Sequence, residues 1–130
     1  MRKKLISKFI ILVTVFLTVS FCSNAQGWGW KKATTVDDVH NFINGTGAYK
    51  KAVAEPKISA VNKGDNIEFY VFYKGYLNTT GNWGWKKSES VDDVHKFING
   101  IAPYSGAVMK AEICSVNKGT YLEFYIFYKK

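Results

Sequence analysis

The sequence has little cysteine, proline and histidine, with two residues of each in a chain of 130. This cysteine count excludes a disulfide-dense miniprotein, and so little proline beside 11 glycines excludes a collagen-like or low-complexity chain. The chain contains no HExxH, GxSxG or CxxC motif and no glycine-rich phosphate loop. We therefore expect a small protein that binds a partner rather than an enzyme, and we expect no cofactor.

Acidic residues are missing from the first 25 positions, which begin with a basic segment and continue with the apolar run 9–21. The run is shorter than the ~20 apolar residues that cross a bilayer as a helix. Small residues before Gln26 complete the pattern of a cleaved signal peptide over residues 1–25. We expect a secreted or periplasmic bacterial protein with no transmembrane anchor in its mature form.

A lipoprotein is the alternative, because Cys22 follows the apolar run. Phe21 argues against lipid attachment, since the residue before a lipidated cysteine is normally small. If Cys22 leaves with the signal peptide, Cys114 is the one remaining thiol, and no intramolecular disulfide can form. Ser59 occupies the position equivalent to Cys114 in the repeat described next, which favours a small strand residue over a reactive nucleophile.

The chain contains an internal repeat. Residues 28–74 align with residues 83–129 without a gap, and about 28 of the 47 paired positions are identical. Such identity indicates two copies of one supersecondary unit. The polar segment 75–82 between them, bounded by glycine at its start, reads as a linker.

Each copy predicts a short helix followed by a β-hairpin. Thr35 and Ser90 are N-cap candidates, and the glycine after each Asn-Gly step closes helices expected at 36–43 and 91–98. Asn-Lys-Gly turns then join two β-rich runs. One copy is too small to bury a core, so we expect a single α+β domain over residues 26–130. Its predicted form is two pseudo-symmetric halves that share one continuous antiparallel sheet, with both helices on one face.

Aspartate and histidine recur on both predicted helices, and they are the candidate metal or acid–base residues. Asp37 and His40 lie three residues apart, so they could share a metal ion or a proton; the second copy repeats them as Asp92 and His95. Two ligands do not make a site, and acidic residues in a first helical turn already suit the helix dipole. Capping and packing are therefore the preferred interpretation.

The most suggestive motif is WGWKK, which occurs in both copies. In an extended segment both tryptophans of one motif project to the same side, and such rings suit the recognition of sugars or proteins. The alternative is that the rings pack on their own helix and sheet. The candidate ligand-binding residues are Trp28, Trp30, Lys31, Trp83, Trp85 and Lys86.

The sequence therefore predicts a secreted binding module for an extracellular or periplasmic glycan or protein. After the leader, 14 basic and 10 acidic residues leave a charge of only +4, so we do not expect nucleic acid as the partner. The general plan resembles protein inhibitors of secreted hydrolases, which implies an inhibitor as one alternative. A self-associating envelope protein and, with less support, a small metal-dependent hydrolase are the others.

Overall fold

The computed structural model describes residues 27–130; the expected signal peptide and Cys22 lie outside these residues. The first repeat contains β1 (Gly29–Ala33), α2 (Val36–Asn44), β2 (Lys57–Asn62) and β3 (Ile67–Tyr73). The second contains β4 (Gly84–Ser88), α3 (Val91–Asn99), β5 (Lys110–Asn117) and β6 (Leu122–Lys129). The fold is therefore α+β, as predicted. Neither of these two helices is long and apolar enough to cross a membrane.

Capping residues fix the start and the end of both helices, which lie within one residue of the bounds predicted from the sequence. The hydroxyls of Thr35 and Ser90 accept hydrogen bonds from the main-chain N–H groups of Asp38 and Asp93, which caps the first turn of each helix. Each helix ends at a glycine with positive φ, Gly45 at 67° in the first repeat. The aspartates of each first turn lie at the positive end of the helix dipole.

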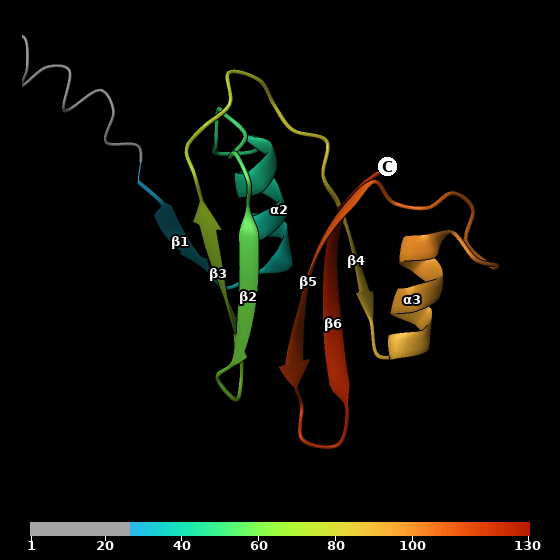
Figure 1. Cartoon of the computed structure of the whole chain (residues 1–130). Coiled ribbons are helices and arrows are strands. Elements are labelled where there is room, and N and C mark those ends of the chain that lie inside the picture. The colour runs from blue at the N-terminus through green and yellow to red at the C-terminus, as the bar shows by residue number, and fades with distance from the viewer. Residues whose placement is uncertain (1–26) are drawn as a thin grey trace, which may run out of the picture.

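The prediction of one continuous sheet is wrong, because the strands form two antiparallel sheets of three strands (Figure 1). The first sheet has the order β1-β3-β2, and the second has the order β4-β6-β5. In each sheet the last strand of the repeat is central, and the WGWKK segment pairs along one side of it. β2 and β5 lie side by side, but no ladder of hydrogen bonds joins them.

Each sheet has two chemically different faces, because side chains alternate along a strand. The helix face is apolar and lies against the helix of its own repeat, so that Phe42 of α2 contacts Tyr73 of β3 with ring centroids 5.2 Å apart. The opposite face, which we call the aromatic face, contains the tryptophans and a Glu-x-Tyr-x-Phe series. This series is Glu68, Tyr70 and Phe72 in the first sheet and Glu123, Tyr125 and Phe127 in the second.

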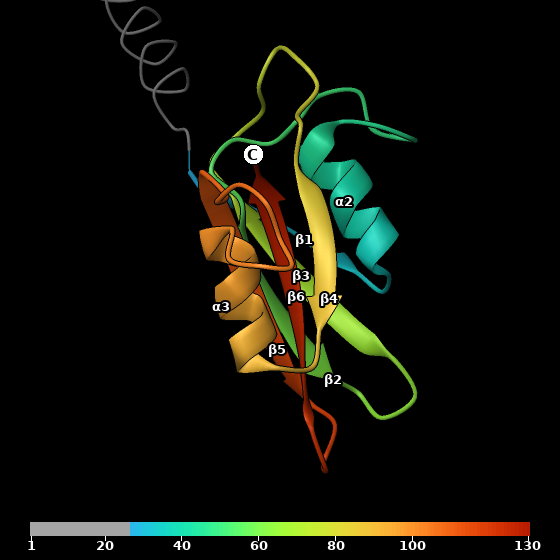
Figure 2. The same cartoon turned by 90° about the vertical axis from the view of Figure 1, so that its right-hand side faces the viewer.

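The two sheets meet along the edges of β2 and β5, and two unlike faces turn toward the same core. These are the helix face of the first sheet, with α2, and the aromatic face of the second, and the Phe69 and Tyr125 rings meet edge to face at 5.2 Å. Buried residues of both sheets thus form one continuous core. α3 covers the other face of the second sheet, where it forms a smaller core with Ile126. β4 consequently runs between the two helices in the view of Figure 2. Both helices therefore do not share one face of one sheet, as the sequence analysis expected.

Glycine within WGWKK has a packing role on the helix face. A Cβ at Gly29 would lie 2.7 Å from the Tyr73 ring, and one at Gly84 would lie 2.8 Å from the Tyr128 ring. Both tyrosine rings are themselves held against helix phenylalanines, at 5.2 Å in the first repeat and 4.8 Å in the second. The glycine therefore lets a tyrosine ring lie across the strand while the tryptophans on either side face the other way.

We predict that Gly84→Ala destabilises the protein by about 1–3 kcal/mol, since the new methyl group overpacks the Tyr128 ring. Gly27→Ala is the control, because among residues 27–130 no heavy atom beyond its chain neighbours lies within 4 Å of a Cβ built there. Urea unfolding of both variants measures the free energy of unfolding. Equal stability of the two variants would show that the tyrosine ring does not need the space that glycine leaves.

Candidate binding surface

The two copies of WGWKK lie in different environments although their sequences are identical. In the second repeat Trp83 is 5% exposed and Phe127 is fully buried, because the first repeat covers that aromatic face. In the first repeat Trp30 is 63% and Phe72 43% exposed. The two motifs therefore do not form equivalent sites, and only the first repeat presents a free aromatic face.

We call the core shared by the helix face of the first sheet and the aromatic face of the second the joint between the repeats; Phe69 and Tyr125 meet there. A polar clamp fixes Trp83 at this joint. Asn44, near the end of α2, accepts a hydrogen bond from the Trp83 main-chain N–H at 2.7 Å and donates one to the Trp83 carbonyl at 2.9 Å. His40, one turn earlier, donates from Nε2 to the same carbonyl at 2.8 Å. A buried amide that satisfies both main-chain groups of one residue fixes the position of the second sheet against the first.

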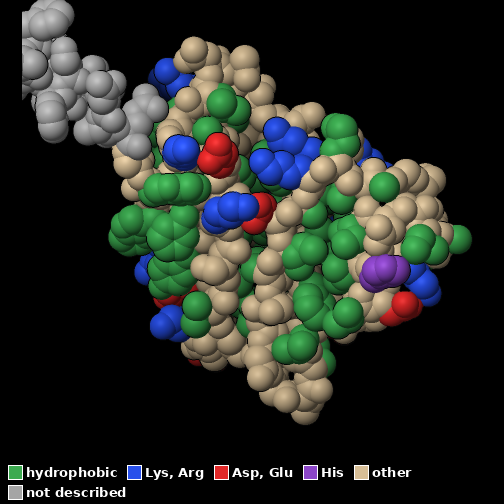
Figure 3. Space-filling model, viewed as in Figure 1, with side chains coloured by type: hydrophobic (Ala, Val, Ile, Leu, Met, Phe, Trp, Pro, Cys, Tyr) green, Lys and Arg blue, Asp and Glu red, His purple; other side chains and the backbone are tan. Residues whose placement is uncertain are grey.

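The free aromatic face of the first sheet is a continuous apolar and aromatic surface with polar groups at its margin. Figure 3 shows hydrophobic side chains gathered at the left of the molecule, over this sheet. Trp30 pairs with Phe72 across β1 and β3, and its ring centroid lies 6.4 Å from that of Tyr70. Exposed rings in contact are typical of binding surfaces. The surface consists of Trp28, Trp30, Lys32, Lys57, Ser59, Val61, Glu68, Tyr70 and Phe72.

A carboxylate with a tyrosine and a lysine recurs on both aromatic faces. In the first sheet Glu68 accepts a hydrogen bond from the Tyr70 hydroxyl at 2.5 Å and lies 3.8 Å from the Lys32 ammonium. The Tyr70 hydrogen bond, assisted by the positive charge of Lys32, lowers the pKa of Glu68. This partly buried carboxylate therefore stays negatively charged at neutral pH, beside the tryptophan and phenylalanine rings.

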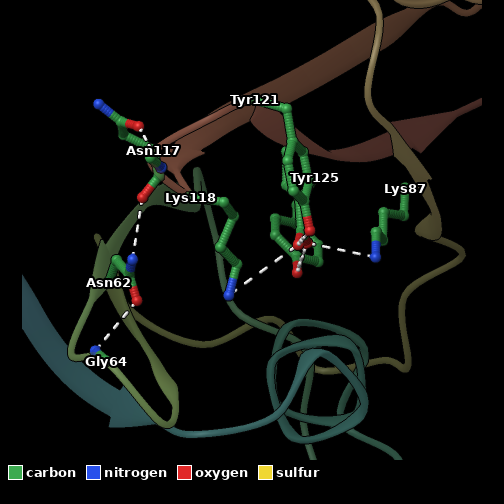
Figure 4. A network of polar contacts seen from close by, with 9 residues as sticks. Asn62, Gly64, Lys87, Asn117, Lys118, Tyr121 and Tyr125 are labelled. Atoms are coloured by element: carbon green, nitrogen blue, oxygen red, sulfur yellow. Dashed lines mark hydrogen bonds and ion pairs between the residues drawn. The ribbon is translucent and has the colours of Figure 1, made fainter.

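The equivalent carboxylate in the second sheet, Glu123, is buried at the joint. It accepts a hydrogen bond from Tyr125 at 2.6 Å, and the ammonium groups of Lys87 and Lys118 lie 3.3 Å and 3.9 Å away. Figure 4 shows these side chains and Tyr121 directed at the same carboxylate. The Tyr125 hydrogen bond and Lys87 lower the pKa of Glu123, while burial raises the pKa of Tyr125. Every polar atom of the cluster thus has a partner.

The structure separates the candidate lysines from the tryptophans beside them in sequence. Lys31 lies on the helix face, where its ammonium is 3.5 Å from Asp38 and 5.1 Å from the centre of the Tyr49 ring. Lys86 has the same surroundings in the second repeat, 3.3 Å from Asp93 and over the Tyr104 ring. Tyr49 and Asp38 raise the pKa of Lys31. These two lysines connect strand to helix, and Lys32 is the WGWKK lysine that lies on the free aromatic face.

The candidate metal and acid–base residues do not converge. His40 binds the Trp83 carbonyl, whereas His95 lies exposed on α3. Asp37 and Asp92 are exposed in their first helical turns, and Asp92 pairs with Lys96 at 2.8 Å. Within residues 27–130 no group of three or more His, Cys, Asp or Glu side chains is arranged to hold a metal ion.

Cys114 belongs to the buried joint. Burial raises the pKa of its thiol to about 12, so the nucleophilic thiolate is scarce at neutral pH. Trp85, the last of the candidate residues, lies at the margin of the joint and is 37% exposed.

Comparison with protein-family models, with curated proteins and with solved structures finds no match for the chain.

Asn44 and Asn99 provide a matched test of the clamp, since they occupy the same position in the two helices. We predict that Asn44→Ala lowers the free energy of unfolding by about 2–3 kcal/mol, because it leaves buried main-chain groups of Trp83 unpaired. Asn99 is exposed and bonds only to the His95 carbonyl of its own helix, so Asn99→Ala should cost about 0.5 kcal/mol or less. Chemical denaturation of the two variants measures the difference; similar losses would contradict the clamp.

Glu123 gives the protein a pH-dependent stability. Its folded-state pKa is lowered below the ordinary value of 4.5, so its contribution is present above that pH and is lost as pH falls through the folded-state pKa. Glu123→Gln should cost about 1–3 kcal/mol at neutral pH. The cost should shrink on acidification, which thermal melts between about pH 7 and about pH 3 can follow.

Glu68→Gln is the comparison for this series, because Glu68 has the equivalent partners Tyr70 and Lys32 on the uncovered face. The pKa of Glu68 is also lowered, so this variant should lose melting temperature with the same pH trend as Glu123→Gln but by a smaller amount, since solvent weakens its interactions. A Glu123→Gln variant with a pH-independent deficit, or one that matches Glu68→Gln, would show that the buried carboxylate does not stabilise the joint.

Proposed function

We propose that the exported protein is a non-enzymatic binding module that recognises a protein surface through the free aromatic face of its first repeat. The observation that carries this proposal is the second copy of the same face. There, Trp83, Tyr125 and Phe127 are buried against a helix and a sheet. The motif therefore already binds a protein surface within this chain.

The chemistry of the free face supports the same conclusion. Trp28, Trp30 and Phe72 remain about half exposed. Exposure of large apolar side chains to water is unfavourable in free energy, and a partner that covers them would recover it. A rim of Lys32 and Glu68 offers charges of both signs to a partner. Aromatic centres with polar rims are typical of protein interfaces.

The face can be tested with a photo-reactive benzoyl amino acid in place of Trp30, in the cell that produces the protein. We predict a discrete protein adduct after irradiation, identified by mass spectrometry. The same group in place of Asp65, at the exposed tip of the β2–β3 hairpin, is the control and should give no such adduct.

Glycan recognition is the competing outcome. Affinity electrophoresis through neutral and acidic polysaccharides should leave the mobility of the protein unchanged. Retardation that Trp30→Ala abolishes, together with no protein adduct from position 30, would contradict a protein partner and assign the face to a glycan.

A further inference from the structure

The joint between the repeats joins two unlike surfaces. The second repeat contributes its aromatic face, and the first contributes its helix face with the end of α2. Each repeat contains both kinds of surface, so the joint leaves one of each unused. These are the aromatic face of the first repeat and the helix face of the second. A contact between unlike surfaces is heterologous, and it can continue from one molecule to the next.

The unused helix face is exposed where its counterpart is covered. Ile113 of β5 is 42% exposed, whereas Ile58, at the equivalent position of β2, is 8% exposed. Val91, at the start of α3, is 68% exposed, whereas Val36 is partly buried and packs against the core. Figure 3 shows a second gathering of hydrophobic side chains between β5 and α3. The second repeat thus presents an uncovered apolar surface of the kind that holds the joint together.

The polar groups of the clamp are present again on this surface. His95 and Asn99 repeat His40 and Asn44 on α3, and both are exposed. The main-chain residue that such a clamp would hold is also repeated, because Trp28 stands at the position of Trp83 and is 53% exposed.

The unused aromatic face has nearly the composition of the buried one. Its tryptophans, lysine, glutamate, tyrosine, phenylalanine and valine recur at equivalent positions of the second sheet. The exceptions are Ser59, which stands in place of Cys114, and Lys57, which stands in place of Glu112. A face of this composition fits the helix face of the first repeat, so the same shape and chemistry are available for the helix face of the second.

We infer that the partner of the free aromatic face is a second copy of this chain. This inference rests on the proposed function. The aromatic face of one molecule docks on the helix face of the second repeat of the next, where Asn99 and His95 hold the main chain of Trp28. Assembly proceeds head to tail and gives either closed rings or open chains.

The link between molecules is weaker than the joint inside one molecule, because β2 and β5 already lie edge to edge within each molecule and only the faces remain for the next one. The linker 75–82 holds the two repeats together at an effective concentration of roughly millimolar, and separate molecules lack this advantage. Association should therefore appear as a rise in mean mass when the concentration is increased from about 10 μM to about 1 mM.

The experiment uses residues 26–130, which include every described helix and strand, and two single variants. Phe72→Lys places a charge on the free aromatic face, at the position equivalent to the fully buried Phe127. Ile113→Lys does the same on the free helix face. Both side chains are exposed in the single molecule, so both variants should fold, which circular dichroism checks. Sedimentation velocity then measures the mass of each variant alone and of their mixture.

We expect the native chain to associate and each variant alone to remain a monomer. The mixture should form a complex of one copy of each and grow no further, because each variant supplies the surface that the other lacks. Native chains that stay monomeric, variants that still self-associate, or a mixture without a complex would each overturn the inference. An adduct between position 30 and a different protein, together with a native chain that stays monomeric, would support the proposed function and contradict self-association alone.

Discussion

The structure depends on the burial of one aromatic sheet face against the helix face of the preceding repeat. Each repeat has one nine-residue helix, which covers only one side of its three-stranded sheet. The other side bears tryptophan, tyrosine and phenylalanine, whose exposure is unfavourable. Contact between the two repeats covers the aromatic face of the second sheet and leaves that of the first uncovered. The same contact buries Trp83, Phe127, Cys114 and Glu123.

The local elements of this fold could be predicted from sequence because their signals are local. Helix caps at Thr35 and Ser90, glycines after the helices and Asn-Lys-Gly turns each depend on a few neighbouring residues. The division into two sheets could not be predicted, since it depends on which face of each sheet finds a cover. Identical WGWKK segments carry no information about which copy is buried.

Sequence reasoning reached only those residues of the candidate site that lie together in one short segment. The free aromatic face contains Trp28 and Trp30, but its partners Tyr70 and Phe72 come from a strand about 40 residues away in sequence. Strand alternation alone already separates Lys31 from Trp30 and selects Lys32 as the lysine on the same face. The role of Asn44 had no sequence signal, because a helix-end asparagine followed by glycine also suits a simple helix terminus.

The most direct test of this account is an NMR measurement of contacts between the aromatic rings of the two repeats. The account predicts a nuclear Overhauser effect between the rings of Phe69 and Tyr125, whose centroids are 5.2 Å apart and which lie on different sheets. It also predicts slow amide exchange at Trp83, where the N–H is bonded to Asn44. Ring contacts confined to each repeat, with fast exchange at Trp83, would contradict a core shared by the unlike faces of the two sheets.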